Sequence, residues 1–455
     1  MSTAVLDVGK TNLKFVVFDD AGVLLFDRQM PNTSLPGPPY PHVDVEKIWN
    51  FLGASLREAT KKFKIETLIP TTHGASGAVM NEQGLVLPIM DYEFTNAEDI
   101  NSRYEPLRDA FDKTYSPSMP AGLNVGRQLA WQKWNLSEDF ERVTKIVGYP
   151  QYWTWRLCGK FAFDICSMGA HTDLWLSSEN KSTKLAQALG FDKLVAPITA
   201  PWIEMGMMNA KAAKELGVEP NINILCGIHD SNAALLPYLA SRNAPFTVLS
   251  TGTWVVVMAV GHSLTSLKPD MDMLGNIDAE GRPLATAKFM GGREFAVIAG
   301  DCTSAELIED IRHFIAAKIF ALPSFSTSGG PYASHKGEII GDVKPEQRTS
   351  LATLYAALMC TVTLDNLEID HGDLIVDGSF AQNHLLCEII AALRPEQKLY
   401  VAKDQAGTAR GAAMLATWHQ PHAEPEASLV KPTEISGLKT YYEIWKAMIA
   451  SASGK

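Results

Sequence analysis

The stretch that decides the fold lies at the start of the chain and reads Ala4-Val5-Leu6-Asp7-Val8-Gly9-Lys10-Thr11-Asn12-Leu13-Lys14-Phe15-Val16-Val17-Phe18. Two apolar runs flank a polar turn that contains Gly9, and this order predicts a β-hairpin with buried strands. Backbone amides in such a turn form an anion-binding nest, and Asp7 suits a magnesium ion or its waters. The combination fits a nucleotide triphosphate. An ordinary hairpin with a solvated polar turn is the alternative that this segment leaves open.

A shorter version of the opening recurs near the middle of the chain. The order V-L-x-x-G of Val5 to Gly9 returns at Val248 to Gly252, 243 residues further on, and a threonine and an apolar run follow in both copies. This recurrence predicts a duplicated domain. We expect the two domains to cover residues 1–243 and 244–455.

The composition narrows the classes of protein. The chain has 455 residues, enough for two or three domains, and its 46% hydrophobic and 20% charged residues are typical of globular proteins. The formal net charge of −11, without a basic stripe, argues against nucleic acid and membrane surfaces as partners. The six cysteines have no metal-ligand spacing, so we expect reduced thiols. Without a recognisable secretory signal or membrane span, a cytoplasmic location is expected.

Local patterns predict several further elements. An apolar run at 23–26 extends the hairpin into an antiparallel meander. Asp44 is the expected N-cap of a helix, because apolar residues then recur at helical spacing. A strand at 66–70 ends in a polar turn that contains His73 and Gly74, and strand ends of this kind often carry binding groups.

Asp230 stands at the junction of an expected strand and an expected helix. The strand runs over 221–226 and the helix starts at about Ser231. The positive end of the helix would keep the Asp230 carboxylate ionised, so that it can accept a proton from an attacking hydroxyl. The alternative is an aspartate that only caps the helix.

Other polar residues carry weaker signals. Glu93, Gln128 and Gln151 can hydrogen-bond hydroxyl groups, and the aromatic residues between 91 and 173 either stack on a sugar or belong to the core. Small residues in the turn that follows the expected strand at 374–376 allow a flat ring to approach closely.

Five segments together resemble the FGGY family of carbohydrate kinases, in the family's order. They are DVGKTN (7–12), GIHDSNAA (227–234), LSTGTW (249–254), VDGSFAQN (376–383) and AGTARGAAMLA (406–416). The resemblance implies an α/β fold with two actin-like, ribonuclease-H-like domains flanking a cleft. It places the sugar on the N-terminal FGGY domain, 1–243, and ATP mainly on the C-terminal FGGY domain, 244–455. ATP and Mg²⁺ are the cofactors that it implies.

The resemblance also assigns roles residue by residue. Asp230 matches the catalytic base, which accepts the proton of the sugar hydroxyl, and Asp7 matches the magnesium-associated aspartate. The positions matching phosphate or ATP contacts are Gly9, Lys10, Thr11, Asn12, Thr251, Gly252, Thr253, Gly378, Ser379 and Asn383. The positions expected to contact the sugar are His73, Gly74, Glu93 and Asp230.

Two positions depart from the family's pattern. Lys10 stands where many members have a small residue, and Ser379 replaces the second glycine of a common pair. We hypothesise that Lys10 contacts a phosphate. The chain is also somewhat short for the family, which puts its oligomer contacts in doubt; a homodimer is the assembly we consider.

The loops most resemble rhamnulose and fuculose kinases, which implies phosphorylation of the terminal hydroxyl of a ketose such as L-rhamnulose, L-fuculose or a pentulose. Xylulose, ribulose and glycerol remain alternative acceptors. Two other classes stay open, a sugar- and ATP-sensing regulator without turnover and a heat-shock-type ATPase module. Sugar-dependent ADP formation would separate a kinase from a sensor.

Overall fold

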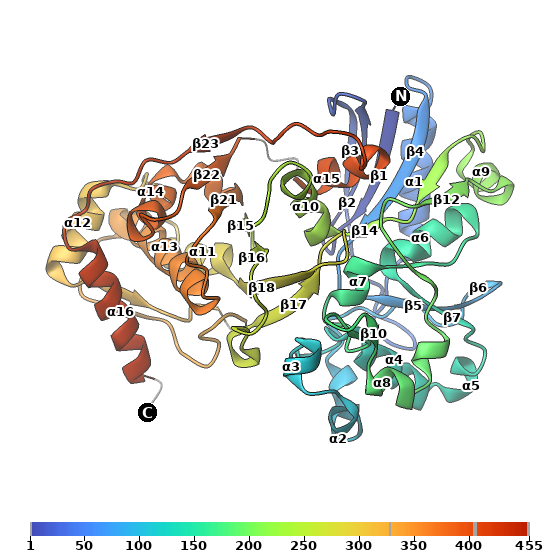
Figure 1. Ribbon diagram of the computed structural model, residues 1–455, viewed down its shortest axis with the longest axis horizontal. Coiled ribbons are helices and arrows are strands. Elements are labelled where there is room, and N and C mark those ends of the chain that lie inside the picture. Colours follow the sequence, from blue (N-terminus) through green and yellow to red (C-terminus); the bar gives the residue numbers. More distant parts are fainter. Residues whose placement is uncertain (1, 327–328, 404–406, 453–455) are drawn as a thin grey trace. The chain divides into compact units, whose positions relative to one another are not determined.

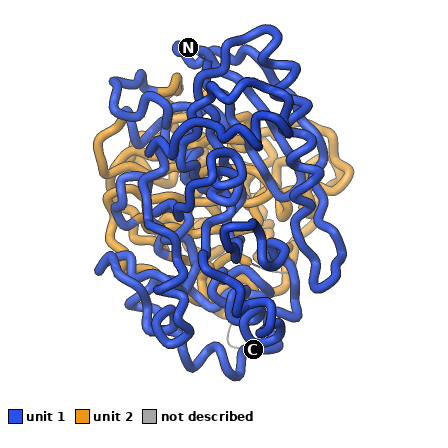
Figure 2. Tube along the Cα trace, turned by 90° about the vertical axis from the view of Figure 1, so that its right-hand side faces the viewer, with its two compact units in different colours: residues 1–241, 275–283, 406–424 blue, residues 242–274, 284–405, 425–455 orange. Residues whose placement is uncertain are grey.

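A computed structural model of the chain describes residues 2–326, 329–403 and 407–452 (Figure 1). The chain divides into two compact units, which Figure 2 shows in two colours. Unit 1 contains residues 1–241, 275–283 and 406–424, and unit 2 contains residues 242–274, 284–405 and 425–455. The two later segments of unit 1 were not part of the predicted domain 1–243. Ala406, the first residue of the last family motif, lies outside the described residues.

The central sheet of unit 1 is built on the opening hairpin. Its strands follow the order β12-β13-β4-β1-β2-β3, and β14 also pairs with β4. Strands β2 and β3 are antiparallel to their neighbours in the hairpin, whereas β4 runs parallel to β1. The bounds are β1 Ser2–Val8, β2 Asn12–Asp19, β3 Leu24–Pro31, β4 Ile65–Thr72, β12 Glu204–Met207, β13 Asn223–Leu225 and β14 Ile228–His229.

The predicted hairpin and meander are confirmed. Val5 pairs with Val16 and Leu6 with Phe15, and all four side chains are at most 5% exposed. Burial of these apolar side chains fixes the register, because a slip of one residue would turn each of them to the opposite face. The polar turn is therefore held at a defined place at the end of β1.

Helices cover the sheet of unit 1, and a smaller sheet extends the unit. The covering helices are α1 Val45–Ala59, α6 Tyr149–Cys158, α9 Ala210–Leu216, α10 Asp230–Leu239 and α15 Gly407–Met414. Asp44 caps α1 as predicted, since its side chain accepts a hydrogen bond from the backbone amide of Lys47 at 3.0 Å. The smaller sheet contains β5 Gly77–Asn81, β6 Gly84–Leu85 and β7 Lys145–Gly148, beside α4 Val125–Asn135.

Unit 2 is organised around a second hairpin. Its sheet has the order β17-β18-β16-β15-β21-β22-β23, with β15 antiparallel to β16 and parallel to β21. The strands are β15 Phe246–Thr251, β16 Val255–Val260, β17 Met273–Ile277, β18 Pro283–Phe289, β21 Asp373–Gly378, β22 Leu399–Ala402 and β23 Ala427–Leu429. The main helices are α11 Gly291–Ala299, α12 Ile308–Ala317, α13 Arg348–Asn366, α14 His384–Leu393 and α16 Leu438–Ala452.

The two central sheets share one arrangement of five strands. In unit 1 the order β13-β4-β1-β2-β3 has parallel pairs up to β1 and antiparallel pairs beyond it. In unit 2 the order β22-β21-β15-β16-β18 has the same directions. This common order supports the duplication that the recurring V-L-x-x-G pattern predicts. Among the described residues, no helix combines the length and apolar character needed to cross a bilayer.

Helix α15 returns to unit 1 late in the chain and packs against α10 and β1. The two helices touch through their backbones at Gly411: a Cβ atom there would lie 1.8 Å from the carbonyl oxygen of Ala233. Real Cβ atoms do not approach so closely, and the position therefore requires glycine. The small residues of the last family motif thus serve close packing on the helix that begins with Asp230.

We predict that Gly411→Ala destabilises unit 1 by about 1–3 kcal/mol, because the added methyl group must push α15 off α10. The matched control is Gly53→Ala in α1, where the new Cβ would meet the side-chain ends of Arg57 and Leu216 at 3.1 and 3.4 Å and the Leu216 Cα at an ordinary contact distance of 3.7 Å. Thermal unfolding of both variants measures the difference. Equal stability of the two variants would contradict the proposed contact.

Candidate functional site

The first loop is the turn between β1 and β2. The amide of Gly9 donates to the carbonyl oxygen of Asn12 at 3.0 Å and closes the turn. Asn32, just after β3, clamps it from outside: its side-chain amide donates to the Gly9 carbonyl at 2.7 Å and its backbone amide donates to the Thr11 carbonyl at 2.8 Å. Thr11 and Asn12 are exposed at the tip. A rigid turn with exposed donors suits the predicted phosphate contact, although no residue pattern pointed to Asn32.

Asp7 lies on β1 directly before this turn, opposite Lys14 in the hairpin register. Burial, reinforced by the negative charge of Asp230, raises the pKa of Asp7 to about 7, against the opposing effect of Lys14. The structure therefore brings Asp7 and Asp230 into each other's electrostatic field within unit 1. A carboxylate whose ionised form is disfavoured by burial and by a second carboxylate forms a place where a cation is favourable.

Asp230 is the first residue of α10 and follows β14 directly, at the predicted junction of strand and helix. Its Oδ1 accepts a hydrogen bond from the backbone amide of Ser231 at 2.6 Å, and the side chain is 30% exposed. His229 occupies the N-cap position, so the capping alternative for Asp230 is wrong. The carboxylate is positioned at the helix N-terminus and still reaches solvent.

His229, for which no role was predicted, is a buried neighbour of Asp230. Its Nε2 lies 3.3 Å from Asp230 Oδ1, and its Nδ1 lies 3.0 Å from the side-chain oxygen of Asn232. Asn232 in turn donates to the carbonyl oxygen of Ile277 at 2.7 Å. A Cβ atom at Gly74 would lie 2.4 Å from His229 Nε2. Gly74 thus leaves room for the imidazole ring that borders the carboxylate.

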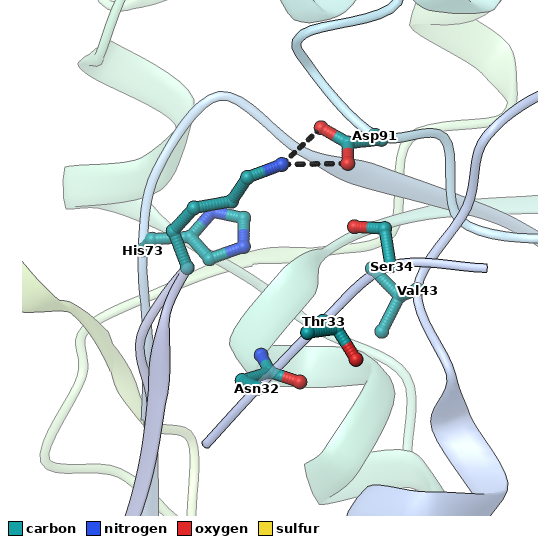
Figure 3. A pocket seen from close by; sticks show the side chains of 7 residues that line it. Asn32, Thr33, Ser34, Val43, His73 and Asp91 are labelled. Carbon is teal, nitrogen blue, oxygen red and sulfur yellow. Dashed lines mark hydrogen bonds and ion pairs between the residues drawn. The ribbon is translucent and has the colours of Figure 1, made fainter. Parts of the chain in front are cut away.

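A small pocket of unit 1 joins the first loop to the turn after β4 (Figure 3). Its lining residues are Lys10, Asn32, Thr33, Ser34, Val43, His73 and Asp91. The ammonium of Lys10 lies 2.5 and 2.6 Å from the two carboxylate oxygens of Asp91 and 3.2 Å from Glu93 Oε2. Asp91 was missed, because nothing in its irregular stretch of sequence distinguishes it. Glu93 reaches the edge of this pocket through its side-chain contact with Lys10 and through its backbone amide, which donates to Asp91 Oδ1 at 2.9 Å.

His73 is enclosed by two tyrosine rings. The centroid of its ring is 5.2 Å from that of Tyr92 and 5.1 Å from that of Tyr149. Burial lowers the pKa of His73, although its hydrogen bond to the Gly74 carbonyl and the charge of Asp230 act in the opposite direction. Because Nδ1 donates to the Gly74 carbonyl at 2.8 Å, the neutral ring leaves Nε2 as an acceptor, which suits contact with a hydroxyl group.

Gln128 and Gln151, named as weak candidates for hydroxyl contacts, support the backbone instead. The amide of Gln128 donates to the Ala75 carbonyl at 2.6 Å, and that of Gln151 donates to the Cys226 carbonyl at 3.0 Å. Both side chains are at most 1% exposed. They hold the turn after β4 and the end of β13 in place.

The second loop, between β15 and β16 in unit 2, is tied to the turn after β21. The hydroxyl of Thr251 donates to the Asp377 carbonyl at 2.6 Å and accepts from the Phe380 amide at 2.9 Å. A Cβ atom at Gly378, where φ is +90°, would lie 2.0 Å from the Thr251 carbonyl oxygen. Unit 2 therefore brings together the predicted residues Thr251 and Gly378, which are far apart in the sequence.

The other predicted residues of unit 2 lie around the same two turns. Thr253 and Ser379 are exposed, and Gly252 is closely approached by α11, since a Cβ atom at Gly292 would lie 2.2 Å from its carbonyl oxygen. The Asn383 side chain caps α14 and donates to Thr353 at 2.8 Å. The roles of these residues toward ATP remain predictions.

Comparison with known proteins identifies the protein family to which this fold and these loops belong. The family model for the N-terminal domain of the FGGY family of carbohydrate kinases matches residues 3–237, and that for the FGGY C-terminal domain matches residues 243–425. The chain belongs to the FGGY family of carbohydrate kinases.

Individual relatives are more distant. The chain is 27% identical to an L-fuculokinase of Haemophilus influenzae over 279 residues, which are 56% of this chain and 57% of that protein. An L-fuculokinase of Escherichia coli K12 is 26% identical over 263 residues and 55% of its length. The chain thus spans little more than half the length of these relatives.

Solved structures resemble the whole chain. A carbohydrate kinase from Novosphingobium aromaticivorans has a TM-score of 0.90 at 29% identity, over 98% of this chain and 100% of that one. A xylulose kinase from Lactobacillus acidophilus has a TM-score of 0.79 at 15% identity, over 99% and 97%. The predicted two-domain α/β fold is confirmed.

We predict that the metal-free protein loses stability as the pH rises. The pKa of Asp7 is raised to about 7, so the folded chain binds a proton more tightly than the unfolded chain, and stability falls between about pH 4 and pH 7. Asp7→Asn should remove this component, which is at most about 4 kcal/mol. Denaturant unfolding in the presence of a chelator measures it, and identical pH profiles of the two proteins would contradict the raised pKa.

We predict that Thr251→Val weakens unit 2 by about 1–3 kcal/mol, because it leaves a buried carbonyl and a buried amide without the hydroxyl that joins them. If the two turns hold the nucleotide, its Kd should rise about tenfold. Thr251→Ser keeps the hydroxyl and is the matched control. Unfolding and nucleotide titration of both variants provide the test, and indistinguishable variants would show that the hydroxyl is dispensable.

Proposed function

We propose that this protein is an ATP-dependent kinase that phosphorylates the terminal hydroxyl of a small ketose. The observation that carries the proposal is the place of Asp230. Asp230 is the first residue of α10. Its charge raises the pKa of Asp7, which lies directly before the first loop. The same charge acts to raise the pKa of His73, which lines the pocket. A carboxylate between a phosphate site and a hydroxyl-binding pocket is what transfer to a sugar requires.

In the proposed reaction, Asp230 accepts the proton of the acceptor hydroxyl as its oxygen attacks the γ-phosphorus. The bond between that phosphorus and the β,γ-bridging oxygen breaks, and ADP leaves. The backbone amide of Ser231 donates to Asp230 Oδ1 at 2.6 Å at the N-terminus of α10, so that the base is held in one orientation. The neutral ring of His73 would hold the sugar by accepting a hydrogen bond from one of its hydroxyl groups at Nε2.

Mg²⁺ fits the residues of unit 1. Asp7 is a carboxylate whose ionised form is disfavoured by burial and by Asp230, and a divalent cation would relieve both effects. The described residues contain no cluster of three or more His, Cys, Asp and Glu side chains, which agrees with an ion that usually keeps several of its waters and takes one or two carboxylates. When bound, Mg²⁺ would neutralise phosphate charge. We propose that Asp7 holds it, directly or through water.

The nucleotide contacts complete the proposal. In unit 1, the proposed phosphate contacts are Gly9, Thr11 and Asn12 of the first loop. In unit 2, the proposed phosphate contacts belong to the second loop, where Thr251 is tied to the turn after β21. The second-loop residues are Thr251, Gly252 and Thr253, and the proposed adenosine contacts are Gly378, Ser379 and Asn383. Phosphoryl transfer depends on positioning and charge neutralisation, so hydroxyls, amides, a cation and one carboxylate suffice.

The acceptor we propose is a deoxyketohexose of the fuculose or rhamnulose type. The relatives named L-fuculokinase support this choice, at 25–27% identity over 56–58% of this chain. Xylulose, ribulose and glycerol are the competing acceptors. Hydroxyl stereochemistry is read by pocket geometry, so a panel of ketoses with a coupled ADP assay would identify the substrate.

We predict that Asp230→Asn keeps ATP binding and lowers the rate of transfer by roughly 10²–10⁴-fold, because the amide cannot accept the proton. Asp27→Asn, an exposed aspartate on β3, is the matched control and should retain full activity. Single-turnover phosphorylation together with nucleotide titration separates binding from transfer. Comparable turnover by Asp230→Asn would refute the base assignment. Sugar binding without sugar-dependent ADP formation in the unmodified protein would favour the sensor.

A further inference from the structure

Lys10 departs from the family's pattern, and the sequence predicts that it contacts a phosphate. In the structure its ammonium is bound to Asp91. We propose that Lys10 is an acceptor-binding residue, which donates to an oxygen of the sugar and selects an uncharged polyhydroxy substrate. This inference rests on the proposed kinase function. It assigns the nucleotide to the backbone of the first loop and the Lys10 ammonium to the neighbouring pocket.

Asp91 anchors the ammonium of Lys10. Both carboxylate oxygens of Asp91 lie within 2.6 Å of Lys10 Nζ, and the Asp91 side chain is only 8% exposed. The carboxylate is itself held by the hydroxyl of Ser34 and by the backbone amide of Glu93, which donates to Oδ1 at 2.9 Å. Figure 3 shows Ser34 and His73 beside this ion pair. The ammonium is thus fixed in the pocket before any ligand enters.

A phosphate contact that drew Lys10 away from Asp91 would break this arrangement. It would leave a buried carboxylate without its cation, which is strongly unfavourable. The first loop does not need the side chain for phosphate contact, because its exposed residues Thr11 and Asn12 and the nearby Lys14 supply donors. The geometry favours a Lys10 that stays with Asp91 during turnover.

Glu93 marks the place that the acceptor would take. An ammonium has three donors, and the contact of Lys10 with Glu93 is the longest of its ion-pair distances, at 3.2 Å. The Glu93 side chain is 66% exposed, and exposed ion pairs contribute little to stability. An acceptor oxygen can therefore replace Glu93 at Lys10 while Asp91 remains in place.

The charge around the pocket selects the class of acceptor. Asp91 and Glu93 lie against the single ammonium of Lys10, and the charge of Asp230 acts on His73 and Tyr92 at the same pocket. The summed charge of these side chains is negative, so a carboxylate group on the sugar would be repelled. The remaining polar lining consists of neutral groups suited to hydroxyls. A ketose is therefore preferred over an aldonate of the same length.

The experiment compares Lys10→Met with Lys64→Met, the same substitution at a lysine that is 79% exposed and pairs only with Glu66. Acceptor KM and ATP KM are measured separately with the ketose panel, and MgADP and ketose binding are measured by calorimetry. We expect Lys10→Met to raise the acceptor KM and Kd by 10- to 100-fold and to change the ATP KM and MgADP Kd less than twofold. Lys64→Met should match the unmodified protein.

A further variant separates anchoring from folding. Asp91→Asn keeps Lys10 but removes its anchor and should also raise the acceptor KM at least tenfold. The unmodified protein should prefer a ketose over the matching aldonate by at least 100-fold in kcat/KM. Asp91→Asn also keeps the inference testable if Lys10→Met fails to fold.

Several outcomes would overturn the inference. They are a tenfold increase in ATP KM with an unchanged acceptor KM in Lys10→Met, unchanged values for both substrates, or comparable use of the aldonate by the unmodified protein. Failure of the proposed kinase function is distinguishable from these outcomes, because the unmodified protein would then phosphorylate none of the sugars in the panel. In that case calorimetry decides, because ketose binding weakened by Lys10→Met supports the inference, and the absence of ketose binding overturns it too.

Discussion

The mutual repulsion of Asp7 and Asp230 is the constraint on which the site of unit 1 depends. Burial and the second carboxylate raise the pKa of Asp7 to about 7. The ionised form of Asp7 is therefore energetically unfavourable unless a cation lies nearby. The fold nevertheless fixes both residues, one by the register of a buried hairpin and the other at the start of α10. Because the two carboxylates are fixed before any ligand binds, the electrostatic field that would attract the Mg²⁺ of the proposed ATP complex is already present in the fold.

The sequence predicted those features that depend on neighbouring residues. The hairpin, the cap at Asp44 and the junction at Asp230 follow from local periodicity and from capping chemistry, and the structure confirms all three. The ion pair between Lys10 and Asp91 could not be predicted, because 81 residues separate the partners and only the packing of two irregular loops brings them together. The clamp of Asn32 on the first loop was hidden in the same way, because 23 residues separate Asn32 from Gly9.

Polar residues in unit 2 show that many hydrogen-bonding side chains of a loop serve to hold the loop itself in shape. The hydroxyl of Thr251 joins two turns, and the amide of Asn383 caps a helix and binds Thr353. Motif positions of this kind hold the two turns in their shape. Residue type alone does not distinguish a side chain that contacts ATP from one that holds the contacting backbone in place.

The backbone contact between Gly411 and Ala233 has a consequence for how the protein can be divided. The helix that bears the proposed base rests on a segment encoded some 180 residues after it. A fragment cut at the end of the N-terminal family match, at residue 237, would expose the face of α10 that α15 covers. Unit 1 is therefore not a separable module of the gene, and ribosomal synthesis must pass through nearly all of unit 2 before the base-bearing helix acquires its final support.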